Sequence, residues 1–92
     1  MATITISELR PSHYAVDIAG GGTRTHHEVD ASDRDWIEGI SGVDTETLVR
    51  VSVEFLLEHE TATSILPRFT LRDIAHYFPT YPATMGQRLA AR

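Results

Sequence analysis

The stretch DTETLVRVSVEFLLEHE, residues 44–60, lies in the longest run of the chain without glycine or proline. Drawn as a helix, its hydrophobic residues spread over most of the circumference. Thr47, Arg50, Glu54 and Glu58 are left as a single polar stripe. A helix with this pattern is covered on several sides, so the rest of the chain has to pack around it.

The same stretch also contains an alternation of β-branched and polar residues that is typical of a half-buried strand. Three observations favour the helix. Asp44 is a good N-cap, the consecutive Leu56 and Leu57 break the alternation, and the stretch exceeds the usual length of a strand. We therefore expect a central helix over residues 44–60.

The N-terminal third has the pattern of short antiparallel strands. Residues 2–8 alternate isoleucine with threonine and serine, and residues 13–19 and 23–29 alternate again. Gly20 to Gly22 lie between the last two runs and predict a hairpin turn. No Lys-Ser/Thr pair follows these glycines, as a phosphate-binding loop would require. We expect a β-hairpin region over residues 2–30.

Two shorter helices are expected on either side of the central one. Ser32 or Asp33 can cap a short helix that Gly39 or Gly42 ends. Trp36 on this helix is interpreted as a core anchor between the hairpin and the central helix. The second short helix covers residues 70–78.

Residues 79–92 are expected to form a Pro-containing tail, because Pro79 ends the preceding helix. Gly86 weakens helix formation, so the chain from there onward is expected to fray. The prediction is a single α+β domain over residues 1–92. A small N-terminal antiparallel sheet of two or three strands packs against the central helix and the two shorter helices, within a helical region at residues 32–78.

Composition excludes several kinds of chemistry. The chain has no cysteine, and all eight basic residues are arginine, so disulfides, thiolate nucleophiles and Schiff-base lysines are ruled out. The net charge of −5 disfavours binding to phosphate backbones, so we expect nucleic acid to be an unlikely partner. No apolar run is long enough for a membrane span and no signal peptide is recognisable, so a cytoplasmic protein is expected.

The five histidines do not have the spacing of a metal site. His26 and His27 are adjacent on an expected strand and should point to opposite faces. His59 begins a sequence similar to H-E-x-x-H, but Thr63 occupies the position of the second histidine. We expect no metal, no cofactor and no catalytic residues, hence no enzymatic activity.

The sequence TLRDIAHY at residues 70–77, with PATM at 82–85, resembles the helix-turn-helix of LacI-type repressors. This resemblance implies that Ala75 packs between the two helices and that Pro82 opens the recognition helix. It also implies that Thr84 faces DNA.

The resemblance has two departures. Pro79 replaces the usual glycine of the turn and cannot adopt a positive φ angle. Gly86 then weakens the helix that would enter the major groove. A DNA-binding transcriptional regulator with a degenerate helix-turn-helix at residues 70–89 is therefore the alternative interpretation.

Aromatic and arginine side chains concentrate between residues 67 and 82, among three prolines. Such side chains on a stiff segment are typical of protein interfaces. Phe69 and Phe78 are assigned to the core. The candidate partner-binding residues are Arg68, Arg72, Tyr77 and Tyr81. The expected function is a small acidic protein-interaction or regulatory module without catalytic activity, which contacts another protein or a second copy of itself.

Overall fold

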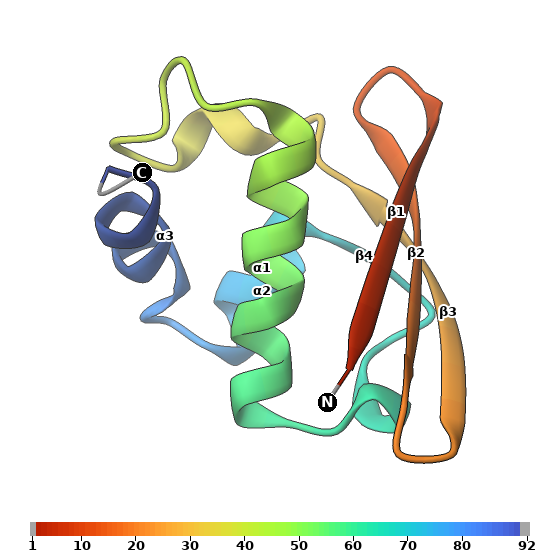
Figure 1. Cartoon of the computed structure of the whole chain (residues 1–92). Helices are drawn as coiled ribbons and strands as arrows, with labels where there is room; N and C mark the ends of the chain where they lie inside the picture. Colours follow the sequence, from red (N-terminus) through yellow and green to blue (C-terminus); the bar gives the residue numbers. More distant parts are fainter. Residues whose placement is uncertain (1, 91–92) are drawn as a thin grey trace.

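The computed structural model describes residues 2–90 and forms, over that range, a four-stranded sheet and three α-helices. Figure 1 shows the helices on one side of the sheet, with α1 next to it and α3 farther out. The elements in chain order are β1 (Thr3–Arg10), β2 (His13–Gly20), β3 (Thr23–Asp30), η1 (Arg34–Trp36), α1 (Thr45–His59), η2 (Ala62–Ser64), β4 (Arg68–Thr70), α2 (Leu71–Tyr77) and α3 (Tyr81–Ala90). The predicted α+β class is confirmed.

The first three strands form an antiparallel meander in chain order. Gly21 and Gly22 make the turn between β2 and β3, with φ angles of 58° and 82°. A two-residue hairpin turn requires positive φ at both positions, and glycine adopts it without strain. The predicted hairpin is therefore confirmed, with the turn at the expected glycines.

The sheet has four strands, whereas two or three were expected. β4 pairs with β3 in parallel, with Phe69 opposite Val29. The N–H of Glu28 donates to the carbonyl of Pro67 at 2.8 Å just before this short ladder. Three residues are too few to show a strand pattern in the sequence, and β4 forms only because the chain returns to the sheet after α1.

The central helix forms as predicted. The carboxylate of Asp44 accepts the backbone N–H of Thr47 at 3.3 Å and caps the first turn of α1. Side chains around most of the helix are buried, including Val49, Val53 and Phe55. Burial on several sides is possible because the sheet covers one side of α1 and the C-terminal helices cover the other (Figure 1).

The short helix expected after Asp33 is reduced to the single 3₁₀ turn η1. Asp33 does not cap it, because its carboxylate instead accepts the backbone N–H of Arg72 at the start of α2. Gly39 and Gly42 both adopt φ of 85° and bend the chain before a helix can extend. Trp36, expected to anchor the core between the hairpin and the central helix, is only half-buried, and its ring centroid lies 6.4 Å from that of Tyr81 of α3.

The prediction of a tail over residues 79–92 is wrong, because most of this segment is the helix α3. Tyr81, Met85 and Leu89 are spaced four residues apart and are at most 4% exposed. This buried stripe holds the helix against α1 despite Gly86. Residues 91–92 of the expected tail lie outside the described residues.

Within the described residues, the helices cover one face of the sheet. Tyr14, Val16 and Ile18 of β2 point toward them and are at most 5% exposed. The intervening Ala15 and Asp17 lie on the opposite face, which is polar and open to solvent. The molecule therefore has one apolar core between the sheet and its helices.

Candidate interaction surface

A groove opens between the C-terminal end of α1, the segment that follows it and α2. Its volume is ≈ 180 Å³. An apolar cavity of about 150 Å³ accommodates benzene, so this groove has room for one branched or aromatic side chain. The residues that line this α1–α2 groove are Leu56, Glu60, Ser64, Ile65, Leu66, Phe69, Asp73, Ile74, Tyr77 and Phe78.

Two exposed hydrophobic side chains lie at this groove. Among residues 2–90, the large hydrophobic side chains that are exposed are Leu9, Leu66 and Tyr77, with exposed fractions of 50%, 43% and 63%. Single exposed hydrophobic residues are common on protein surfaces and need no special explanation. Leu66 and Tyr77, however, continue the apolar lining of the α1–α2 groove outward and enlarge it into one patch.

A buried histidine holds Leu66 in place. His27 of β3 is only 3% exposed. Its Nδ1 lies 2.8 Å from the carbonyl oxygen of Leu66, which can only accept, so Nδ1 carries the hydrogen. Nε2 lies 2.9 Å from the hydroxyl of Thr25. The segment bearing Leu66 is therefore tied to the sheet by a satisfied buried polar group. Sequence reasoning missed this role, although His27 lies at a core-facing position of its strand.

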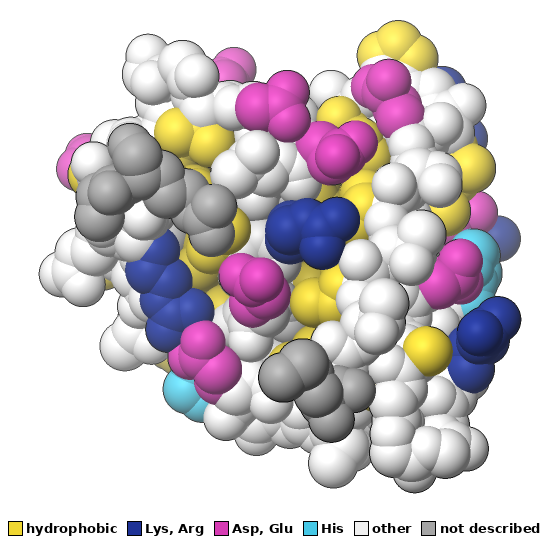
Figure 2. All heavy atoms as spheres, in the orientation of Figure 1, with side chains coloured by type: hydrophobic (Ala, Val, Ile, Leu, Met, Phe, Trp, Pro, Cys, Tyr) yellow, Lys and Arg dark blue, Asp and Glu magenta, His cyan; other side chains and the backbone are white. Residues whose placement is uncertain are grey.

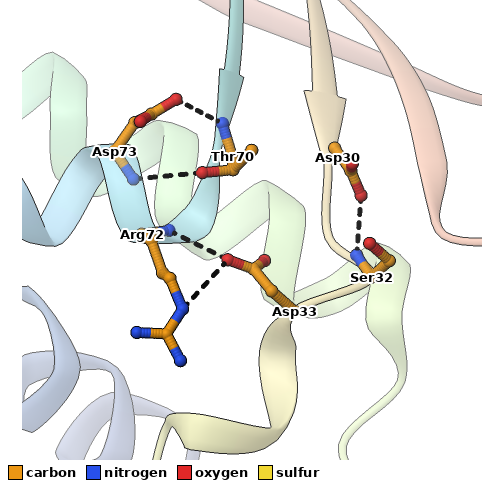
Figure 3. A network of polar contacts seen from close by, with 6 residues as sticks. All are labelled: Asp30, Ser32, Asp33, Thr70, Arg72 and Asp73. Carbon is orange, nitrogen blue, oxygen red and sulfur yellow. Dashed lines mark hydrogen bonds and ion pairs between the residues drawn. The ribbon is translucent and has the colours of Figure 1, made fainter.

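The start of α2 is held by a network of polar contacts shown in Figure 3. Thr70 and Asp73 form a capping box, in which each side chain accepts the backbone N–H of the other residue. Asp33, from the segment before η1, adds the contact to the Arg72 N–H at 3.3 Å. Tyr77 lies on the last turn of this anchored helix, so its position at the groove is well defined.

The four predicted partner-binding residues do not form one patch. Tyr77 lies at the groove. Arg68 has a side chain that is 82% exposed, and its Nε lies 3.0 Å from the carboxylate of Glu28. Arg72 is not among the residues that line the groove, and its guanidinium lies 5.1 Å from the ring centroid of Trp36. Each arginine thus already has a partner within the chain.

Tyr81 is a core residue, so its assignment to an exposed partner-binding surface is corrected. It is 0% exposed, and its hydroxyl lies 2.7 Å from the Oγ of Ser52. Ser52 donates to the carbonyl of Leu48 at 2.7 Å, so Tyr81 is the donor to Ser52. Burial raises the pKa of Tyr81 well above its ordinary value. The ring also lies 5.5 Å from that of Phe55, which completes its enclosure.

The adjacent histidines point to opposite faces of the sheet, as predicted. His26 is exposed, and its Nδ1 lies 2.7 Å from the carboxylate of Asp17. His27 points into the core. Within residues 2–90, no group of three or more histidine, aspartate or glutamate side chains is arranged to hold a metal ion.

α2 and α3 are joined by residues 78–80, so the chain does contain a helix pair where the LacI-type resemblance lies. Thr84, which the resemblance places toward DNA, donates its hydroxyl to the backbone carbonyl of Thr80 at 2.9 Å. This hydroxyl is therefore engaged within the chain. At Gly86, an added Cβ would lie 2.8 Å from the carbonyl oxygen of Glu38. One face of α3 is therefore covered by the backbone that follows η1.

No protein-family model matches this chain, and comparison with curated proteins and with solved structures finds no significant match. Over residues 2–90, none of the helices has both the length and the apolar character needed to cross a membrane.

Proposed function

We propose that this chain is a cytoplasmic protein-interaction module without catalytic activity, which binds an apolar side chain of a partner protein in the α1–α2 groove. The observation that supports it is the position of Leu66 and Tyr77, two exposed hydrophobic side chains beside a groove that has room for one more. Tyrosine is enriched among residues that dominate binding energy. Its ring supplies a large contact area while few rotatable bonds have to be ordered.

The charges around the groove indicate the character of the partner. Glu60 and Asp73 are its acidic lining residues. Asp73 is already engaged in the capping box with Thr70, whereas Glu60 is half-buried at the end of α1. An acidic group beside an apolar groove favours a basic residue next to the partner's apolar one. We infer that the partner segment presents a leucine or an aromatic residue next to a lysine or an arginine.

Phage-displayed peptides selected on the wild-type protein would test this function, with affinities measured by fluorescence anisotropy. We expect Tyr77→Ala and Leu66→Ser each to weaken binding by about tenfold or more, as for central residues of an interface. Leu9→Ser is the matched control, because Leu9 is equally exposed but lies outside the α1–α2 groove. Peptides that bind the Tyr77→Ala and wild-type proteins equally well would contradict the proposal.

A DNA-binding regulator remains the second candidate, because α2, a three-residue connection and α3 have the order of a helix-turn-helix. Several contacts weigh against it. Thr84 bonds to its own helix, and the backbone of Glu38 covers Gly86. Arg88, the basic residue in the last turn of α3, is held by the carboxylate of Glu58 with two contacts of 2.6 Å.

A further inference from the structure

β1 is an edge of the sheet, and no other strand within residues 2–90 pairs with its outer side. It is eight residues long and contains no proline, and Thr3 to Glu8 pair with β2 in an unbroken register before an irregularity between Glu8 and Arg10. An exposed edge of this length is a template for another strand. We propose that this strand is β1 of a second copy of the chain, so that two sheets join antiparallel about a two-fold axis through Ile6. The surface shares no residue with the α1–α2 groove.

The turn between β2 and β3 shows which backbone groups point to which neighbour. Gly20 and Thr23 face each other beside this two-residue turn. They therefore form a hydrogen-bonded pair, and such pairs alternate along an antiparallel ladder. Every second residue of β3, counted from Thr23, points its backbone N–H and C=O groups toward β2. The residues between them point these groups away from β2. The N–H of Glu28, one of those between, donates to the carbonyl of Pro67 at 2.8 Å, as this alternation requires.

The same alternation holds along β2. The β2 residues that face Thr5 and Ser7 therefore point their backbone N–H and C=O groups toward β1. Because Thr5 and Ser7 are bonded to β2, the N–H and C=O groups of Ile4, Ile6 and Glu8 point to the open edge. The side chains of Ile4 and Ile6 are half-buried against the core. The edge therefore offers alternating backbone donors and acceptors next to an apolar rim.

A positive charge lies at this edge. Nη1 of Arg50, on α1, donates to the outward-pointing carbonyl of Ile4 at 3.1 Å. A guanidinium has five N–H donors, so others remain for a second acceptor. Figure 2 shows hydrophobic side chains and a basic group along the line where α1 meets β1, with acidic side chains on either side. A carboxylate brought here by a partner strand would meet Arg50.

A two-fold axis through Ile6 supplies that carboxylate. In this antiparallel register, Ile6 faces Ile6 of the second copy and Ile4 faces Glu8 of the second copy. The side chains of both pairs lie on the helix-covered face, where Arg50 contacts Ile4. Glu8 of each copy therefore forms an ion pair with Arg50 of the other copy, which gives two symmetric ion pairs. If the two-fold axis passed through Thr5 instead, Glu8 of the second copy would no longer face Ile4. Arg50 would then have no carboxylate from the second copy beside it. Charge complementarity therefore favours a second copy in the first register.

Sedimentation equilibrium with reversed charges tests the ion pairs. We expect a concentration-dependent dimer for the wild type, and a dimer dissociation constant raised about tenfold or more for Arg50→Glu or Glu8→Arg alone. Combining the two changes exchanges the charges and should return the constant toward the wild-type value. Asp35→Arg makes the same charge change as Glu8→Arg but on η1, away from β1, and should have no effect.

Cysteine cross-linking tests the register in a chain that has no cysteine of its own. The axis through Ile6 places Thr5 opposite Ser7 of the second copy, within reach of a disulfide. Both side chains are exposed, so their replacement leaves the core unchanged. Mixed Thr5→Cys and Ser7→Cys proteins should give mainly the heterodisulfide. Wild-type protein that stays monomeric at millimolar concentration, charge reversals without effect, or mainly Thr5→Cys homodimers would each overturn the proposal.

Discussion

Tyr77 and Tyr81 are four residues apart in the chain, yet one lies in water and the other in the core. The difference comes from what each ring meets. Tyr77 ends α2 beside an open groove, whereas Tyr81 begins α3 and inserts beside Phe55 and Trp36. The hydroxyl of Tyr81 finds Ser52, so its burial leaves no polar group without a partner. Tyr81 therefore serves packing, whereas Tyr77 remains exposed at the groove that we propose as a binding site.

We predict that Tyr81→Ala lowers the free energy of unfolding by about 3–5 kcal/mol, because it leaves a cavity in the core. Tyr81→Phe keeps the ring and should cost about 0.5–1.5 kcal/mol through the lost hydrogen bond to Ser52. Tyr77→Ala is the matched control and should change stability by less than about 0.5 kcal/mol. Urea denaturation measures all three. Equal losses at Tyr77 and Tyr81 would mean that the burial assigned to Tyr81 is wrong.

A second prediction concerns Glu58 and acid stability. Hydrogen bonds from the Arg88 guanidinium hold the pKa of the Glu58 carboxyl below its ordinary value of 4.5. A carboxyl with a lowered pKa in the folded state stabilises the protein at neutral pH, and this stabilisation is lost as the pH falls below 4.5. Because both side chains are partly exposed, we expect at most about 1 kcal/mol.

Urea unfolding of wild type and Glu58→Gln between neutral and acidic pH measures this contribution. We expect Glu58→Gln to be less stable at neutral pH and the two proteins to converge in acid. Arg88→Gln should behave in the same way, because replacing either residue removes the same two contacts of 2.6 Å between Arg88 and Glu58. A difference between the proteins that stays constant over the whole pH range would argue against the ion pair.

α3 exists because of its position against α1 rather than because of its composition. Its sequence contains Gly86 in the interior, a poor choice for a stable isolated helix, whereas Pro82 lies in the first turn, where proline is tolerated. The buried stripe of Tyr81, Met85 and Leu89 compensates by removing three large side chains from water. Gly86 is also useful in the folded state, because it allows the backbone of Glu38 to approach the helix closely.

The third prediction follows from that close approach. Gly86→Ala should raise intrinsic helix propensity by about 1 kcal/mol. The new Cβ, however, would lie 2.8 Å from the carbonyl oxygen of Glu38, a backbone atom that cannot simply rotate away. We expect the steric cost to win, with a net loss of about 1–3 kcal/mol in urea denaturation.

Gln87→Gly is the control for this prediction, since it changes helix propensity at the adjacent exposed position of α3 without a steric conflict. It should cost about 0.5–1 kcal/mol. A Gly86→Ala protein that is more stable than wild type would show that the backbone after η1 moves away from α3 at little cost.

The molecule as a whole has a two-layer arrangement with several distinct surfaces. Helices cover one face of the sheet, the other face is polar, and β1 ends the sheet as an open edge. The α1–α2 groove lies at the opposite end of the strand order, beside β4. A second copy at β1 and a partner at the groove could therefore bind at the same time.

Our fourth prediction is that the protein shows no salt-dependent binding to duplex DNA at physiological ionic strength. The net charge of −5 repels phosphates, and Arg72 and Arg88 already contact acidic side chains. Fluorescence anisotropy with random and genomic fragments measures this. Micromolar binding that weakens in Arg72→Ala or Arg88→Ala would instead support the helix-turn-helix interpretation.

The amino-acid sequence by itself determined the elements whose signals are local. Asp44 and a long hydrophobic run predicted α1, the glycine triplet predicted the hairpin turn, and Thr70 predicted the start of α2. The aromatic cluster between the prolines did not separate the exposed Tyr77 from the buried Tyr81, because both residues fit its pattern equally well. Caps, turns and periodicity depend on residues a few positions apart, so they can be read along the chain.

Only the tertiary structure decided the features that depend on distant contacts. β4 needs β3 beside it, and α3 becomes a helix because α1 offers an apolar surface for Tyr81. Leu66 joined the candidate site because the buried His27, far away in the sequence, holds its carbonyl. The free energy of each of these contacts comes from burying groups that the chain brings together only on folding, and no local pattern of residues encodes that pairing.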